Sequence, residues 1–145
     1  MKNNKCILHI NCNYIGTTLH QTMIEYLDKL DYYNEVFVPT YDKDLSVIVP
    51  NENVCVCECF HKWDRIFFNN KQRKICRELE NRIVVNKFNL IHAYTLFTDG
   101  NCARMLSKRY AIPYVVAIRN TDVNVFFKYR PYLRKRGIQI MKDAA

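Results

Sequence analysis

Short apolar runs alternate along the chain with longer segments in which apolar residues recur every three or four positions. The runs are rich in β-branched residues and predict five strands, at residues 6–11, 35–38, 54–59, 89–94 and 112–118. The longer segments predict five helices. The first begins at Thr17 or Thr18, the second covers 70–87, and the third begins at a cap formed by Thr98 and Asp99. The fourth ends near Tyr129, and the fifth begins near Pro131. Such alternation is typical of βαβ units around a parallel sheet.

Some positions within these elements carry specific expectations. Pro39 is expected to end the second strand, because proline cannot donate to a ladder, and Gly137 is expected to interrupt the last helix. The polar stretch 39–53 reads as turns around a short apolar run at 47–49. The buried stripe of the first helix is predicted to consist of Leu19, Met23, Tyr26, Leu27 and Leu30.

The expected fold is an α/β, Rossmann-like three-layer sandwich with a mostly parallel central sheet, formed as a single domain by residues 1–145. The three glycines lie too far apart for a GxGxxG fingerprint or a phosphate-binding P-loop. Neither of the two serines stands in a GxSxG setting, which disfavours a serine hydrolase. No run of about 18 apolar residues could span a bilayer.

The charge of the chain indicates its kind of partner, and its cysteine content indicates its cellular compartment. The chain has 22 Lys and Arg against 14 Asp and Glu, for a net charge of +8, which favours a negatively charged partner. It has seven cysteines, and the apolar run near the N-terminus is too short for the hydrophobic core of a secretory signal. We therefore expect reduced thiols in the cytoplasm.

Three loops follow predicted strands and carry polar residues: 13–18, 94–100 and 119–122. Ligands of open α/β sheets bind beyond the carboxyl ends of the strands, so these loops are expected to form one rim. Gly16 is explained either by a tight turn or by a ligand that approaches the first helix at its N-terminus. Tyr94 and Thr95 lie just past a strand end, whereas His92 lies inside the strand and is expected to be a hydrogen-bonded core residue.

The sequence Arg119-Asn120-Thr121-Asp122 is the strongest candidate for ligand binding. The guanidinium of Arg119 can make bidentate contacts to phosphate or carboxylate, while Asn120 and Asp122 can orient sugar hydroxyls. The alternative is a loop closed by an internal pair between Arg119 and Asp122.

Two other groups of residues have a structural explanation beside a functional one. Cys55, Cys57, Cys59 and His61 alternate, but neighbours two apart on a strand lie about 6.6 Å from each other, so buried cysteines are favoured and no metal is expected. Five basic residues are interleaved with aromatic ones between Phe126 and Arg136. This stretch fits an anionic membrane surface, nucleic acid, or a solvated helix face.

Two stretches resemble the N-terminal domain of family 4 glycosyltransferases, which have the GT-B fold. Residues 89–122, NLIHAYTLFTDGNCARMLSKRYAIPYVVAIRNTD, resemble the family's strand ending in His-Ala-His, its helix, and its Ile-Pro strand ending in His-Gly-x-Asp. ILHINCNYIGTTLHQTMIEYLDKL resembles the first strand, glycine-bearing loop and helix. The resemblance covers most of the chain and is weakest over 41–54. Tyr94 and Arg119 replace family histidines, so no catalytic residue is carried over.

The resemblance implies the acceptor-side domain of an enzyme that transfers sugar from a nucleotide sugar to a glycan or lipid-linked acceptor in surface polysaccharide synthesis. It implies no metal and no cofactor, and a second domain that holds the nucleotide sugar; this chain alone is expected to be inactive. Expected partners are those substrates, the inner face of the membrane, and a second copy across an uncovered interdomain face. The expected substrate-binding residues are Gly16, Tyr94, Thr95, Arg119, Asn120 and Asp122.

The alternative function is a basic α/β module that binds nucleic acid or an anionic membrane surface. Within this alternative nucleic acid is disfavoured, because the sequence contains no recognisable DNA- or RNA-binding motif.

Overall fold

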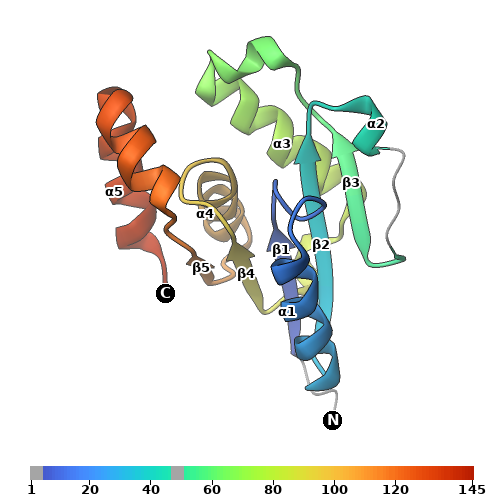
Figure 1. The fold of residues 1–145 in the computed structure, drawn as a ribbon. Helices are drawn as coiled ribbons and strands as arrows, with labels where there is room; N and C mark the ends of the chain where they lie inside the picture. The colour runs from blue at the N-terminus through green and yellow to red at the C-terminus, as the bar shows by residue number, and fades with distance from the viewer. Residues whose placement is uncertain (1–4, 47–50) are drawn as a thin grey trace.

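The fold is an α/β architecture built on a fully parallel sheet, as predicted. A computed structural model describes residues 5–46 and 51–145, so the predicted run at 47–49 lies outside the described residues. Five strands follow the order β3-β2-β1-β4-β5 (Figure 1). Their bounds are Cys6–Ile10 (β1), Tyr33–Thr40 (β2), Val54–Glu58 (β3), Leu90–Ala93 (β4) and Tyr114–Val116 (β5). The order reverses between β1 and β4, as in Rossmann-like sheets.

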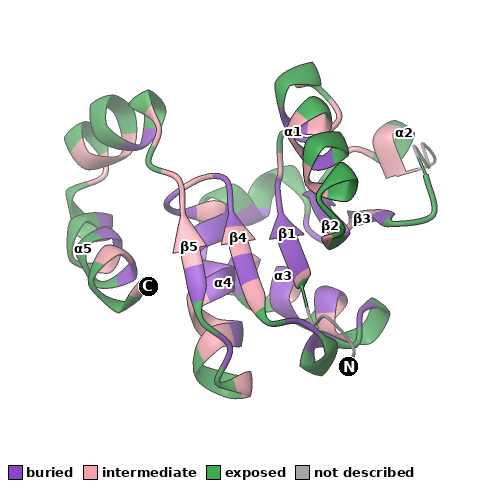
Figure 2. Ribbon diagram, turned by 90° about the horizontal axis from the view of Figure 1, so that it is seen from below, coloured by how far each residue is buried: buried purple, intermediate pink, exposed green. Residues whose placement is uncertain are grey.

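Helices cover the two faces of this sheet unequally. Helix α1 lies on one face, and α3 and α4 lie on the other (Figure 2). The α-helices are Thr18–Lys29 (α1), Lys43–Ser46 (α2), Phe68–Arg82 (α3), Thr98–Tyr110 (α4) and Arg134–Asp143 (α5). Shorter helical turns are Lys62–Arg65 (η1), Val85–Lys87 (η2), Asp122–Phe127 (η3, a π-helix) and Pro131–Leu133 (η4).

Apolar burial follows the same division. The larger core lies between the sheet and α3 and α4, where Leu8, Phe37 and Ile91 are fully buried. The smaller core, under α1, contains Ile24 and Val36. Because apolar burial is the main favourable term in folding, α3 and α4 contribute most to stability.

The prediction that Pro39 ends the second strand is wrong, because β2 continues to Thr40. In a parallel ladder, alternate residues direct both their backbone groups to the same neighbouring strand. The carbonyl of Phe37 accepts from the N–H of Asn11, on the β1 side of the strand. Pro39 is two residues further along, so its backbone groups also point toward the β1 side. Strand β1 has already ended at Ile10, so the missing N–H of Pro39 leaves no ladder bond unmade.

The predicted stripe of the first helix is also shifted. His20 and Ile24 are its buried residues, with Met23 and Leu27 partly buried against the same core. The predicted positions Leu19, Tyr26 and Leu30 are all more than half exposed. A polar residue faces inward because the sheet beneath α1 is itself polar at this point.

Two predictions about helix ends need correction. Helix α3 ends at Arg82, before the predicted 87, because Ile83 adopts an extended conformation that buries its side chain. Gly137 lies inside α5 and does not interrupt it. A Cβ at Gly137 would meet the ring of Phe97 at 2.9 Å, so the glycine allows close packing of this helix.

Gly100 provides a test of packing between α4 and β5. A Cβ there would lie 2.9 Å from Val116 Cγ2 and 3.1 Å from the Thr95 carbonyl oxygen. We expect Gly100→Ala to lower the free energy of unfolding by about 1–2 kcal/mol, because overpacking exceeds the helix-propensity gain. Gly16→Ala is the matched control, since its Cβ would meet only Asn13 O at 4.0 Å. Urea unfolding measures both; equal stability of Gly100→Ala and wild type would contradict this packing.

Candidate functional site

A cleft of about 350 Å³ opens where the strand order reverses, beyond the carboxyl ends of β1 and β4. Cys12 and Asn13 from the loop after β1 form part of its wall, and Thr95 and Thr98 come from the loop after β4. Two further hollows share Cys12 and Asn13 with this cleft. The three predicted loops therefore do meet at one rim, as parallel strands require.

Basic side chains outnumber acidic ones in the lining of the cleft. Four basic side chains reach it: Arg65 from η1, Lys71 from α3, Arg119 after β5, and Arg130 after η3. The Nζ of Lys71 lies 3.4 Å from the Oγ1 of Thr98, in the first turn of α4. Burial lowers the pKa of Lys71, because it disfavours the charged ammonium group. An anion bound beside Lys71 would stabilise that charged form. This chemistry suits a phosphate or a carboxylate.

Asp122 lies at the cleft, but its carboxylate is hydrogen-bonded to the backbone. One oxygen accepts hydrogen bonds from the N–H groups of Leu96, at 3.1 Å, and Arg119, at 2.9 Å. The side chain of Asp122 is buried. Of the alternative, a loop closed by a pair between Arg119 and Asp122, the structure shows the contact through the Arg119 N–H and not through its guanidinium. Consequently the guanidinium of Arg119 is not neutralised by Asp122.

The guanidinium of Arg119 instead contacts His20 Nε2. His20 is buried on α1, and its Nδ1 lies 2.9 Å from the Nδ2 of Asn11. Burial, reinforced by Arg119, lowers the pKa of His20, so the imidazole is neutral at pH 7. The neutral ring accepts from the Arg119 guanidinium through Nε2 and so orients Arg119 without cancelling its charge.

Tyr94 lies beneath the cleft, in a buried chain of hydrogen bonds. Asn34 uses its amide nitrogen to donate to Asp28 at 2.8 Å, which leaves its oxygen to accept from His9 Nε2 at 2.9 Å. The Nδ1 of His9 then accepts from the hydroxyl of Tyr94 at 3.0 Å. Burial lowers the pKa of His9 to about 4 and raises that of Tyr94, so both are neutral. Tyr94 supports the site from below.

His92 belongs to the same layer. Its ring stacks on Tyr94 with centroids 4.3 Å apart, and His20 packs on that tyrosine at 4.7 Å. Burial lowers the pKa of His92 to about 4. His92 was expected to be a hydrogen-bonded core residue; among the described residues it is half-buried and stacked on Tyr94, and its ring makes no side-chain hydrogen bond.

Thr95 and Asp99 connect two of the rim loops. The hydroxyl of Thr95 donates to Asp99 at 3.0 Å and accepts from the Asp99 N–H at 3.2 Å. The other carboxylate oxygen of Asp99 accepts from the N–H of Cys12 at 3.2 Å. Complete burial raises the pKa of Asp99 to about 7. The predicted cap of α4 is therefore supplied by Thr95, whereas the side chains of Thr98 and Asp99 do not cap it.

The remaining predicted site residues lie apart from the cleft. Gly16 lines the neighbouring hollow with Arg119, has no positive φ, and is open to solvent. Asn120 is exposed in the first turn of the helix over 120–129, where its side chain contacts Asn124. Of the six predicted residues, Thr95, Arg119 and Asp122 meet at the cleft.

Sequence reasoning missed Arg65, Lys71 and His20. Arg65 lies in η1 and Lys71 in α3, elements for which the sequence analysis predicts no binding role, and His20 lies outside the predicted apolar stripe of α1. The charge pattern of 62–74, which holds five basic residues and one acid, was the available signal.

The described residues contain no cluster of three or more His, Cys, Asp or Glu able to hold a metal ion. Cys57 and Cys59 are buried, while His61 is exposed beyond the end of β3. Nor does the described part of the chain include a helix long and apolar enough to cross a bilayer. No protein-family model and no curated protein matches this chain.

The depressed pKa of His92 predicts a dependence of stability on pH. Between pH 7 and pH 5 the unfolded imidazole takes up a proton that the folded one, with a pKa near 4, does not, so acid costs stability. His92→Phe keeps the stack and removes this titration, and we expect its unfolding free energy, relative to wild type, to rise by about 1–2 kcal/mol over that range.

For Asp99→Asn we expect the unfolding free energy, relative to wild type, to fall between pH 7 and pH 5. The raised pKa of Asp99 lets the folded wild-type protein bind a proton that the unfolded chain does not, so acid stabilises wild type at this residue and the variant loses that gain. Urea unfolding at both pH values measures each difference. Parallel pH profiles for wild type and His92→Phe would mean that His92 is not held neutral.

The capping role of Asp122 leads to a further prediction. Asp122→Ala removes the acceptor of two backbone N–H groups and should lower the unfolding free energy by about 2–3 kcal/mol. Asp122→Asn, which keeps an acceptor oxygen, should lose less. Glu52→Ala, at an exposed carboxylate, is the control and should leave stability unchanged. Chemical unfolding distinguishes them; an Asp122→Ala protein as stable as the control would disprove the capping role.

Proposed function

We propose that this chain is the acceptor-side domain of a GT-B-type glycosyltransferase, whose cleft binds the phosphate-bearing part of a sugar acceptor. The observation that carries this proposal is the convergence of four basic side chains at the switch point between β1 and β4. Rossmann-like domains bind their ligands at such points. Many enzymes act on phosphorylated ligands. The resemblance of residues 89–122 to family 4 glycosyltransferases favours sugar transfer over their other reactions.

The wall of the cleft supports an anionic ligand in particular. The acidic residue of its lining, Asp122, accepts from two backbone amides and is outnumbered by four basic side chains. Arg119 presents a planar donor set that matches phosphate oxygens, and Lys71 adds a partly buried charge. The hydroxyl of Thr98 also lines the cleft and, as it accepts from Lys71, keeps its own proton for a sugar or phosphate oxygen.

In a GT-B enzyme a second Rossmann-like domain holds the nucleotide sugar and closes the cleft from the other side. Under this proposal that domain provides the donor site, and the described sheet provides the acceptor site and is inactive by itself. The seven cysteines are free thiols in this structure, which supports a reducing, cytoplasmic location.

The proposal is tested first by anion binding. Isothermal titration with inorganic pyrophosphate should detect binding that weakens about tenfold in Arg119→Gln and in Lys71→Gln, because each removes one charge-assisted contact. Lys108→Gln, at a basic residue of α4 that does not line the cleft, should bind like wild type. Equal affinity in all four proteins would remove Arg119 and Lys71 from the site.

Sugar recognition needs a separate comparison. A prenyl pyrophosphate-linked sugar should bind at least about tenfold more tightly than inorganic pyrophosphate, since the sugar adds hydrogen bonds at the cleft. Equal affinity for the two would leave an anion site and contradict the role in glycosyl transfer. Turnover of a nucleotide sugar by the purified chain would contradict its assignment as an inactive acceptor half.

A further inference from the structure

Positive charge is concentrated in two segments of this chain. Residues 62–74 and 119–136 together hold eleven of the 22 Lys and Arg and two of the 14 acids. Their net charge, +9, exceeds the +8 of the whole protein, so the rest of the chain is nearly neutral. One of the two acids, Asp64, is paired with Lys74 at 2.8 Å, and the other, Asp122, caps backbone amides.

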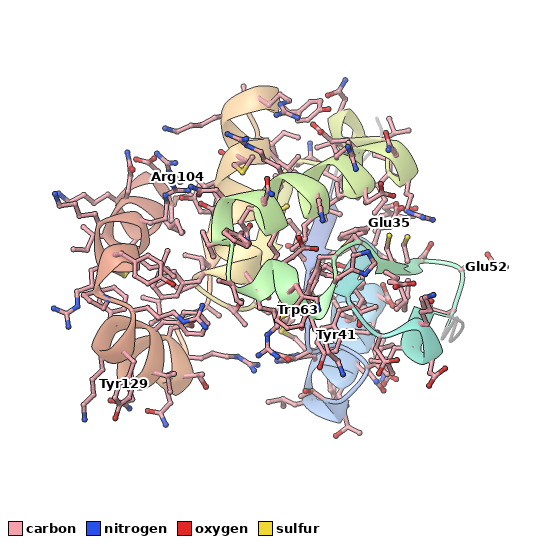
Figure 3. The ribbon with its side chains drawn as sticks, turned by 90° about the horizontal axis from the view of Figure 1, so that it is seen from above. Glu35, Tyr41, Glu52, Trp63, Arg104 and Tyr129 are labelled. Atoms are coloured by element: carbon pink, nitrogen blue, oxygen red, sulfur yellow. The ribbon has the colours of Figure 1, made fainter. Side chains whose placement is uncertain are left out.

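The two segments form one face of the molecule. Both lie at the carboxyl end of the sheet, the upper end in Figure 1. A groove of about 480 Å³ runs between them, with Phe67 and Asn70 on one side and Tyr132, Lys135 and Arg136 on the other. Figure 3 looks down on this end, where Trp63 and Tyr129 mark the two segments. We call this face, built from residues 62–74 and 119–136, the basic face.

Large apolar side chains stand out from the basic face into solvent. Trp63 is 79% exposed, Ile66 65% and Phe67 66%, all within five residues. Across the groove, Tyr129 and Tyr132 are 68% and 65% exposed. Clustered exposure of this kind marks an interaction site, because isolated apolar side chains on a surface are ordinary but a patch of them is not.

The backbone that carries Trp63 is held in place. The carboxylate of Asp64 accepts from the N–H of His61 at 2.7 Å and from Lys74 at 2.8 Å, which fixes η1 against α3. Asp64 itself is buried. The exposed tryptophan is therefore presented by an ordered turn.

We propose that the basic face docks on an anionic lipid bilayer, with Trp63, Ile66 and Phe67 in the headgroup region and the surrounding cations on lipid phosphates. Tryptophan and tyrosine favour the membrane interface, and each basic residue near an anionic surface adds attraction. Nucleic acid would also attract the cations, but branched Ile66 cannot stack on bases, whereas it can enter a bilayer interface.

Docking in this orientation has a consequence for the cleft. Arg65 and Arg130 belong to the two segments of the basic face and also line the cleft. The cleft therefore opens toward the bilayer, where a phosphate-bearing lipid can reach it. The inference of membrane docking does not depend on sugar transfer, because it follows from exposure and charge alone.

Trp63 is the single tryptophan of the chain, so its fluorescence reports docking at this residue. Vesicles of phosphatidylglycerol and phosphatidylcholine should shift its emission to the blue and sediment the protein, and phosphatidylcholine vesicles should do neither. Raising the salt concentration from 50 to 500 mM, at about a threefold shorter screening length, should weaken binding at least tenfold.

Matched variants separate the two contributions. The double variant Ile66→Ser and Phe67→Ser should bind anionic vesicles at least tenfold more weakly, while Leu19→Ser, at an exposed leucine of α1, should bind like wild type. The double variant Lys62→Gln and Lys135→Gln should also weaken binding, unlike Lys29→Gln and Lys108→Gln. Circular dichroism verifies that every variant is folded.

Three results would overturn the proposal: no sedimentation with anionic vesicles, sedimentation without a change in Trp63 emission, or tighter binding to a single-stranded oligonucleotide than to the vesicles at equal salt. Pyrophosphate titration of the same wild-type sample distinguishes failure of docking from failure of the proposed acceptor site. Binding of pyrophosphate without binding of vesicles would leave the proposed acceptor site standing and would disprove the proposed membrane docking.

Discussion

The arrangement of the rim depends on two buried carboxylates that bind backbone amides. Asp122 joins the loop after β4 to the loop after β5 through Leu96 and Arg119, and Asp99 joins the loop after β1 to the start of α4 through Cys12. Carboxyl oxygens are good acceptors for such bonds, and burial keeps water from competing. The same bonds occupy the acids of the rim, so the basic side chains around the cleft remain available to an anion.

The polar layer beneath α1 supports that rim in a different way. A sheet face that would ordinarily be apolar carries His9, His92 and Tyr94, and hydrogen bonds or ring stacking compensate their burial. Because burial keeps the histidines neutral, the layer adds no charge that would repel Arg119. It also explains the inward position of His20, which reaches both Asn11 and Arg119.

The cleft and the basic face share their charged residues, which relates the two proposals physically. Arg65 and Arg130 stand at the boundary, so an anionic lipid headgroup and an anionic ligand would meet the same field. A protein with this charge distribution concentrates phosphate-bearing partners at one end of its sheet. The neutral remainder of the surface has no comparable attraction.

The sequence by itself determined the parallel α/β architecture, because strand and helix periodicities are local and five alternations leave few topologies. It also placed Thr95, Arg119 and Asp122 at one rim, since loops after parallel strands share an edge. The tertiary structure alone decided the phase of α1, where His20 faces inward to meet Tyr94, and the continuation of β2 through Pro39, where β1 has already ended. It likewise brought Lys71 and Arg65 to the cleft, because contacts between distant segments depend on packing, which periodicity does not encode.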